Sequence, residues 1–412
     1  MSAAARSILR ERKNWLVHEL YVRRDFGACL RLIDEQLDAS GGLSEYALYV
    51  KGMIRRQQGR ITESLQLFQA ALCLSPRNVR ILKQVARSLQ LLGKHRNALS
   101  VLEQAVVCGA SEDWEVHHAK GVCYLFRRDL DDAINAFEEA NSCHPHESTY
   151  LQLGKAHELK GDLTSALETY MEALESSPDS TELLTTVGLL YMRKRDTDKA
   201  FEFLGNSLTH DPRDPKTILA AGSIIQDHRD WEVALSKYRV AAARTPHNPH
   251  MWNNIGMCFF GLDKFIASVA CLKRAAYLAP FEWIVQYNLG IVHLRTGQNA
   301  SAFHHLSAAV QLNRRLGNGF HYLAVALGRL GDPDNAISMF ERALKLDDGF
   351  QLRLNYCISL CNCGRVVEAI EQYHEFVRAL EAAAKEDGDD ELLTDPDIII
   401  RRDALAKALN IV

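Results

Sequence analysis

The sequence predicts an all-α solenoid of stacked helical hairpins, and three observations support this prediction. A pattern of small and large residues recurs about every 34 residues along most of the 412-residue chain. The small residues fall where the two helices of a hairpin would touch, and a large residue follows the second of them. Proline closes many copies, where it ends one helix and suits the first turn of the next. Because ten copies keep this register, chance does not explain the pattern.

The register is defined by a small residue at the eighth place of each copy. These residues are Gly52, Ala86, Gly121, Gly154, Gly188, Gly222, Gly256, Gly290, Ala324 and Cys357. A second small residue follows at place 20, as Ser268 does in the copy of Gly256, and a large residue such as Leu272 stands at place 24. Small residues at both places let the two helices approach closely, and we expect the place-24 residue to fill the gap to the next hairpin. This is the tetratricopeptide pattern.

In chain order, the sequence divides into five parts. Residues 1–13 are an N-terminal extension, residues 14–44 a degenerate first repeat, and residues 45–380 ten tetratricopeptide repeats. Residues 381–395 are expected to form an acidic loop, and residues 396–412 a capping helix. Solenoids need a cap over their last apolar face. The expected fold is therefore a tetratricopeptide-repeat superhelical solenoid of about eleven helical hairpins with a C-terminal capping helix.

The composition limits the classes of function. With 47% hydrophobic and 24% charged residues, the chain is typical of a folded protein. Its net charge of −4 gives no general basic field, so we expect no nucleic-acid partner. We also expect no transmembrane segment, because no apolar run is long enough to span a bilayer. Residues 1–13 lack the apolar centre of a secretory signal, so the ten cysteines are expected to be free thiols in the cytosol.

The sequence shows no chemistry of an enzyme. There is no glycine-rich phosphate loop, and no nucleophile stands in register with a base and an orienting group. The best metal candidate joins Cys357, Cys361 and Cys363 to His374. The alternative is structural: Cys357 occupies the small packing place, and the other two point elsewhere from one helix. We therefore expect no catalytic residues, no metal and no cofactor.

The first helix of each hairpin is expected to line the concave surface, with places 2, 5, 6, 9, 12 and 13 facing inward. Amide side chains recur at place 6 and form a ladder that could bond the backbone of an extended peptide. The alternative is that they are simply polar residues on a wet surface. The amide ladder consists of Gln84, Gln152, Asn254, Asn288 and Asn355.

Two further sets of candidate binding residues share these inward places. The early repeats offer a basic patch suited to an acidic tail or partner. It consists of Arg56, Arg80, Lys83, Arg87 and Lys155. The later repeats offer large apolar groups, and so many on a groove predict a buried partner segment; alternatively, some pack against the second helix of their own hairpin. They are Met257, Phe260, Ile284, Tyr287, Ile291, Leu294, Tyr322 and Val325.

Several stretches contain residues that the tetratricopeptide pattern does not require. Residues 252–261, with 83–89 and 182–186, resemble the Bardet–Biedl syndrome 4 family, and the resemblance covers residues 14–380. Asn253, within the first stretch, is not dictated by hairpin packing. Members of that family have a long polar C-terminal tail, whereas this sequence ends soon after the expected cap. The resemblance therefore implies nothing here about functions that rest on the tail.

The resemblance implies a non-enzymatic subunit of the BBSome, a coat-like complex that moves membrane-protein cargo to and from cilia. It implies contacts with other BBSome subunits, both propeller-containing and tetratricopeptide-repeat. Indirect partners would be an Arf-like GTPase, membrane cargo receptors and intraflagellar transport, with dynein–dynactin and centriolar satellite proteins as further candidates. The implied location is the cytoplasm, the cilium and the basal body or centrosome, peripheral to the ciliary membrane through the complex.

Two other functions are alternatives to this one. A stand-alone tetratricopeptide peptide receptor, like a co-chaperone, would bind acidic or extended peptides. It normally needs basic and asparagine residues on adjacent helices, whereas here they lie in different repeats. The helical arm of a glycosyl-transferring enzyme would need a catalytic domain, for which the sequence shows no pattern.

Overall fold

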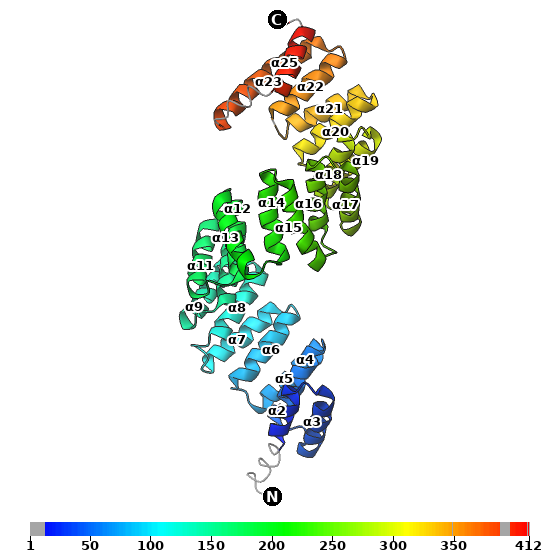
Figure 1. Cartoon of the computed structure of the whole chain (residues 1–412). Helices are drawn as coiled ribbons and strands as arrows, with labels where there is room; N and C mark the ends of the chain where they lie inside the picture. The colour runs from blue at the N-terminus through cyan, green and yellow to red at the C-terminus, as the bar shows by residue number, and fades with distance from the viewer. Residues whose placement is uncertain (1–12, 348, 388–395, 410, 412) are drawn as a thin grey trace. The chain divides into compact units, whose positions relative to one another are not determined.

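The computed structural model describes residues 13–347, 349–387, 396–409 and 411. Within these residues the chain forms 23 helices and no strand (Figure 1). It divides into two compact units, residues 1–203 and 204–412, whose boundary falls inside helix α13 (Thr197–His210). Of the expected N-terminal extension, all but Lys13 lies outside the described residues. The prediction of an all-α tetratricopeptide-repeat fold is confirmed.

Unit 1 is a series of helical hairpins in which, from α2 to α12, each helix packs on the next. We call the first helix of each hairpin A and the second B. The hairpins are α2 (Asn14–Val22) with α3 (Phe26–Ser40), α4 (Glu45–Gln57) with α5 (Ile61–Leu74), α6 (Val79–Leu91) with α7 (His95–Val107), α8 (Trp114–Arg127) with α9 (Leu130–Cys143), α10 (Glu147–Lys160) with α11 (Leu163–Ser176), and α12 (Thr181–Arg193) with α13.

Unit 2 continues the same arrangement and ends in one extra helix. Its helices are α14 (Pro215–Asp227), α15 (Trp231–Arg244), α16 (Pro249–Gly261), α17 (Phe265–Leu278), α18 (Trp283–Arg295), α19 (Asn299–Leu312), α20 (Gly317–Leu330), α21 (Pro333–Leu344), α22 (Phe350–Asn362), α23 (Val366–Asp387) and α25 (Pro396–Ala408). Because α23 runs to Asp387, residues 381–387 are helical, which corrects the acidic loop expected over 381–395. Residues 388–395 lie outside the described residues.

The small residue at place 8 makes room for the large residue at place 24 of the same hairpin. A Cβ atom added at Gly256 would lie 2.7 Å from Cγ of Leu272, and one added at Gly222 would lie 2.5 Å from Cε1 of Tyr238. Residues at place 24 also pack against the next hairpin, as expected: Leu272 lies in one buried cluster with Val285 and Leu289 of α18. Tyr238 clusters with Met251 and Ile255 of α16, and its hydroxyl accepts a hydrogen bond from Nδ2 of Asn254 at 3.3 Å.

The turn between helices A and B needs a residue in the left-handed region. Glycine serves this purpose in several hairpins, as at Gly93 with φ 72° and Gly161 with φ 91°. Arginine occupies the same conformation at Arg128 with φ 69° and at Arg229 with φ 64°. A side chain in this region is unfavourable, so these turns hold a small amount of backbone strain.

Helix α25 covers the apolar face at the end of unit 2. Its Leu405 and Ala406, with the adjacent Leu409, are buried in one cluster with residues of α22 and α23. This contact satisfies the need of a repeat stack for a terminal cap. It also brings residues of α25, such as Ile398, beside the A helices of unit 2.

Candidate partner-binding groove

A groove of about 660 Å³ lies in unit 2 against the A helices α16, α18, α20 and α22 and the capping helix α25. Its apolar lining includes Phe260, Ile291, Leu294, Tyr322 and Val325. The structure therefore brings together five of the eight apolar residues that the sequence singled out. The amide of Asn355, from the predicted ladder, lies in the same groove.

The helical register explains why these side chains meet. Tyr322 and Val325 are three residues apart on α20, and Ile291 and Leu294 are three apart on α18, so each pair shares one helix face. Leu294 is nonetheless only 6% exposed and belongs to the hydrophobic core of unit 2. Leu294 therefore packs mainly within the fold, as the alternative interpretation expected, and presents little surface to a partner.

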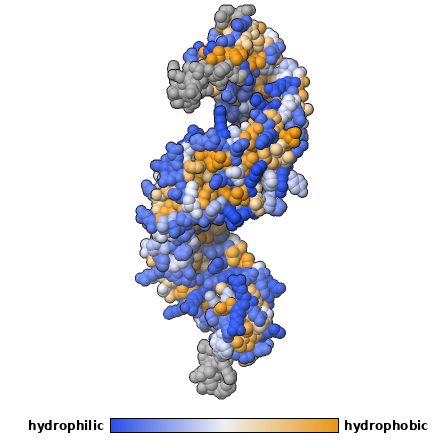
Figure 2. Space-filling view, in the orientation of Figure 1, coloured by the Kyte–Doolittle hydropathy of each residue, from blue (hydrophilic) through white to orange (hydrophobic). Residues whose placement is uncertain are grey.

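The other three apolar candidates do not line this groove. Ile284 is 36% exposed on α18. Tyr287 is half-buried and packs edge-on against Tyr322, with ring centroids 6.0 Å apart. Met257 is half-buried on α16. Figure 2 shows that hydrophobic residues at the surface gather in patches on the face in view.

Arginines give the groove a basic rim. Arg295, Arg329 and Arg401 line it with a single acidic residue, Asp263. Nη1 of Arg329 donates to the carbonyl oxygen of Leu294 at 3.0 Å, which fixes this guanidinium over the apolar lining. The sequence reasoning did not name these arginines. Arg295 and Arg329 occupy place 13, one of the places expected to face inward, so the repeat register could have predicted them. Arg401 comes from the capping helix, which lies outside the repeat.

A buried histidine fixes the polar side of the groove. His321 is 3% exposed, and its Nε2 accepts a hydrogen bond from Nδ2 of Asn355 at 2.8 Å. Its ring stacks on Tyr322, with centroids 4.8 Å apart. Burial lowers the pKa of His321 to about 4, so the ring is neutral at physiological pH. The groove thus has a rigid aromatic and amide wall.

The amide ladder is largely engaged within the chain. Nδ2 of Asn288 donates to Oδ1 of Asn253 at 2.9 Å, and Nδ2 of Asn253 donates to Oδ1 of Asn254 at 3.2 Å. This chain of amides joins α16 to α18. Gln84 accepts a hydrogen bond from Arg56, and Gln152 is half-buried on α10. A peptide would have to share or displace most of these bonds, so the ladder stays a prediction.

Four of the five residues of the basic patch lie on the neighbouring helices α4 and α6. Nζ of Lys83 lies 2.7 Å from Asp113 and 2.6 Å from Glu115, so its charge is already balanced. Arg80 and Arg87 are exposed, and Arg56 is half-buried. Lys155 is exposed on α10, two hairpins further along.

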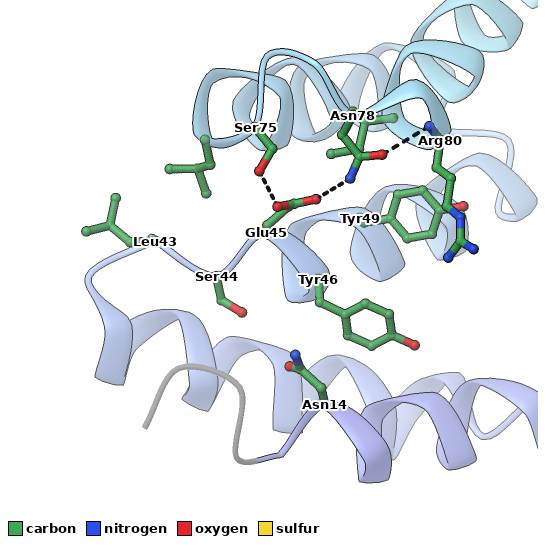
Figure 3. A pocket seen from close by; sticks show the side chains of 11 residues that line it. Asn14, Leu43, Ser44, Glu45, Tyr46, Tyr49, Ser75, Asn78 and Arg80 are labelled. Carbon is green, nitrogen blue, oxygen red and sulfur yellow. Dashed lines mark hydrogen bonds between the residues drawn. The ribbon is translucent and has the colours of Figure 1, made fainter. Parts of the chain in front are cut away.

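A second pocket, of about 550 Å³, lies in unit 1 beside this basic patch (Figure 3). Glu45 extends into it from the first turn of α4 and accepts hydrogen bonds from the Ser75 hydroxyl and from Nδ2 of Asn78, the latter at 2.6 Å. These bonds tie α4 to the segment before α6. Tyr49 and Arg80 complete its wall toward the basic patch.

The cysteines and histidines do not form a metal site in the described part of the chain. No group there of three or more His, Cys, Asp or Glu side chains could hold a metal ion. Cys357 is buried, and its thiol donates to the carbonyl oxygen of Ala369 at 3.2 Å across the hairpin. None of the described helices has both the length and the apolar character to cross a membrane.

Comparison with known proteins agrees with this architecture. Tetratricopeptide repeat models match residues 147–180, 249–282 and 284–348. The BBSome complex member BBS4 of Bos taurus is 50% identical over 366 residues, which cover 89% of this chain and 70% of that protein. The BBS4 of Xenopus tropicalis is 46% identical over 97% of this chain and 77% of its own length. The Drosophila melanogaster homolog is 31% identical over 88% of this chain and 79% of its own length. With this identity and coverage, the chain belongs to the BBS4 family of tetratricopeptide-repeat proteins.

Proposed function

We propose that this protein is a non-enzymatic scaffold and adaptor subunit of the BBSome and binds partner subunits through the A helices of its hairpins. The observation that supports the proposal is the groove of unit 2, which has a large apolar lining and a basic rim. The relatives of this chain are named as members of the BBSome complex, which agrees with a role in binding other subunits. A scaffold needs recognition surfaces rather than reactive groups, and this groove offers one.

The proposed occupant of the groove is an apolar segment of another subunit. Phe260, Ile291 and Val325 are each partly exposed around one concave surface. Fully burying an exposed side chain of this size contributes about 1.5–3 kcal/mol, and covering these half-buried side chains contributes a part of that. The arginines of the rim favour an occupant with acidic residues beside its apolar ones.

Membership of the BBS4 family supports a wider role. We propose that the assembled complex moves membrane-protein cargo to and from cilia, with the protein in the cytoplasm, the cilium and the basal body. Contacts with an Arf-like GTPase, intraflagellar transport, dynein–dynactin or centriolar satellites would then act through the complex or through surfaces other than the groove.

A pull-down tests the role of the groove. The double variant Phe260→Asp with Ile291→Asp places two charges on the apolar lining. It should no longer recover the other subunits when it is used as bait in a cell extract. The control variant Ile266→Asp with Val233→Asp changes two exposed apolar residues of B helices, which are 91% and 50% exposed. It should keep the subunits. Circular dichroism confirms that all proteins fold. Unchanged recovery with the groove variant would contradict the proposal.

One observation favours a second function, a stand-alone receptor for acidic peptides: the arginines of unit 1. Size-exclusion chromatography of the endogenous protein separates the two. Migration with other subunits supports the adaptor. Migration as a monomer, without co-purifying subunits, supports the receptor.

A further inference from the structure

Two arginines of unit 1 lie on neighbouring A helices. Arg56 comes from the last turn of α4 and Arg87 from the middle of α6. Nη2 of Arg56 donates to Oε1 of Gln84 at 2.5 Å, which bridges the two helices one turn before Arg87. Burial lowers the pKa of the Arg56 guanidinium, and the positive charge of Arg87 lowers it further. Since Arg56 reaches Gln84, three residues before Arg87 on the same helix, two like charges are held in one region of the surface.

Arg56 is held in place but incompletely satisfied. Its guanidinium lies 5.5 Å from the centre of the Phe68 ring, and Nη2 also contacts the sulfur of Met53 at 3.1 Å. Its Nη1 is enclosed and has no hydrogen-bond acceptor among the described residues. An enclosed donor without a partner costs free energy, and more so when it is charged. The fold therefore preserves an unsatisfied cation at this position.

Other cations of unit 1 are paired with carboxylates. Lys83, on the same helix as Arg87, has two carboxylates within 2.7 Å. Arg193 on α12 has Glu158 at 2.5 Å, and Lys51 on α4 has Asp34 at 2.7 Å. Among the residues that the structure describes, Arg56 and Arg87 have no such ion pair. Within the basic patch, the acidic groups therefore balance Lys83 and leave Arg56 and Arg87 without a carboxylate.

We propose that Arg56 and Arg87 bind a carboxylate of an acidic segment in a partner protein, with Gln84 positioning Arg56. Guanidinium groups bind carboxylates through paired hydrogen bonds, and a small turn of the Arg56 side chain would bring Nη1 to the same ligand. Arg80, beside the pocket of unit 1, provides a further cation for the next acidic residue of the segment. An anionic ligand removes the repulsion between the two arginines and satisfies the free donor. This inference rests on the proposed function, since it names the chemistry of one partner contact in unit 1.

The test uses the purified full chain and a fluorescein-labelled hexaglutamate peptide at about 150 mM salt, where surface charges are already screened. Fluorescence anisotropy should show saturable binding of hexaglutamate and none of hexaglutamine. The double variant Arg56→Gln with Arg87→Gln should weaken hexaglutamate binding by about tenfold or more. The control variant Arg31→Gln with Arg77→Gln removes the same charge from two exposed positions of unit 1 and should change affinity by less than about twofold.

Stability measurements separate a binding role from a structural one. Because Arg87→Gln removes a repelling charge, it should leave the midpoint of thermal unfolding unchanged or raise it. The same variant should still weaken the binding of hexaglutamate. The proposal is overturned if the wild type shows no saturable binding, if both double variants weaken binding equally, or if the Arg56 and Arg87 variant binds as the wild type does. None of these results depends on the groove of unit 2, so the pull-down on Phe260 and Ile291 can fail or succeed independently.

Discussion

The contact between Gly256 and Leu272 should make even one added methyl group destabilising. A Cβ atom at position 256 would lie 2.7 Å from Cγ of Leu272 and 3.3 Å from the backbone oxygen of Ser268. Leu272 is fully buried, so it has no free space into which it can move. Overpacking of this kind costs about 1–3 kcal/mol. Replacing a helical glycine by alanine returns about 1 kcal/mol. The variant Gly256→Ala should therefore lose about 1 kcal/mol of local stability.

Gly205 provides a matched control. It lies inside α13, and an added Cβ there meets no atom within 4 Å. The variant Gly205→Ala should gain about 0.5–1 kcal/mol, because it has the helical benefit without the clash. The same chemical change is thus expected to act with opposite sign at the two sites.

Hydrogen–deuterium exchange measures both effects locally, which matters because a long repeat array need not unfold in one step. Amides of α16 and α17 should exchange roughly fivefold faster in Gly256→Ala. Amides of α13 should exchange more slowly in Gly205→Ala. Adding Leu272→Ala to Gly256→Ala should cost less than the sum of the two single changes. Equal shifts in the same direction at both glycines would refute the packing argument.

Two further predictions concern a turn and a buried histidine. Arg229 sits at φ 64° between α14 and α15, so Arg229→Gly should stabilise this hairpin by about 1 kcal/mol and slow the hydrogen exchange of its amides; faster exchange would show that the arginine side chain makes an overriding contact. Because burial lowers the pKa of His321 to about 4 from 6.5, the unfolded chain binds more protons between these values, and stability should fall as the pH drops from about 6.5 to about 4. In His321→Gln this decline should be shallower by up to about 1.4 kcal/mol per pH unit, and an unchanged slope would contradict the prediction.

The fold was predictable because packing geometry repeats. Glycine at place 8 and a large residue at place 24 are enough to predict a hairpin, and the register placed the A helices correctly. The spacing predicted that Leu272 would pack on the next hairpin, which it does, but not that it would also lie against Gly256 of its own hairpin. The acidic composition after Leu380 indicated a loop, yet α23 runs on to Asp387, since consecutive alanines favour helix there.

The candidate groove was only partly predictable. Register alone brought Phe260, Ile291 and Val325 to one surface. It could not show that Leu294 is buried, because burial depends on how the neighbouring hairpin packs. It also could not place Arg401, which comes from the capping helix outside the repeat. The positive charges of the basic patch were predictable from the sequence. Only the structure shows that Lys83 forms ion pairs within the chain and that Arg87 forms none with the described residues.

The central claim is that the groove of unit 2 is covered by another subunit in the assembled complex. The most direct measurement replaces Ile291 by the photo-crosslinking residue p-benzoylphenylalanine, irradiates the complex and identifies the crosslinked protein by mass spectrometry. The same residue at Ile266, which is 91% exposed on α17, provides the control. We predict a discrete crosslink from position 291 to an apolar segment of one BBSome subunit, and none to that segment from position 266. Absence of any crosslink from position 291 in the intact complex, or the same product from both positions, would contradict the claim.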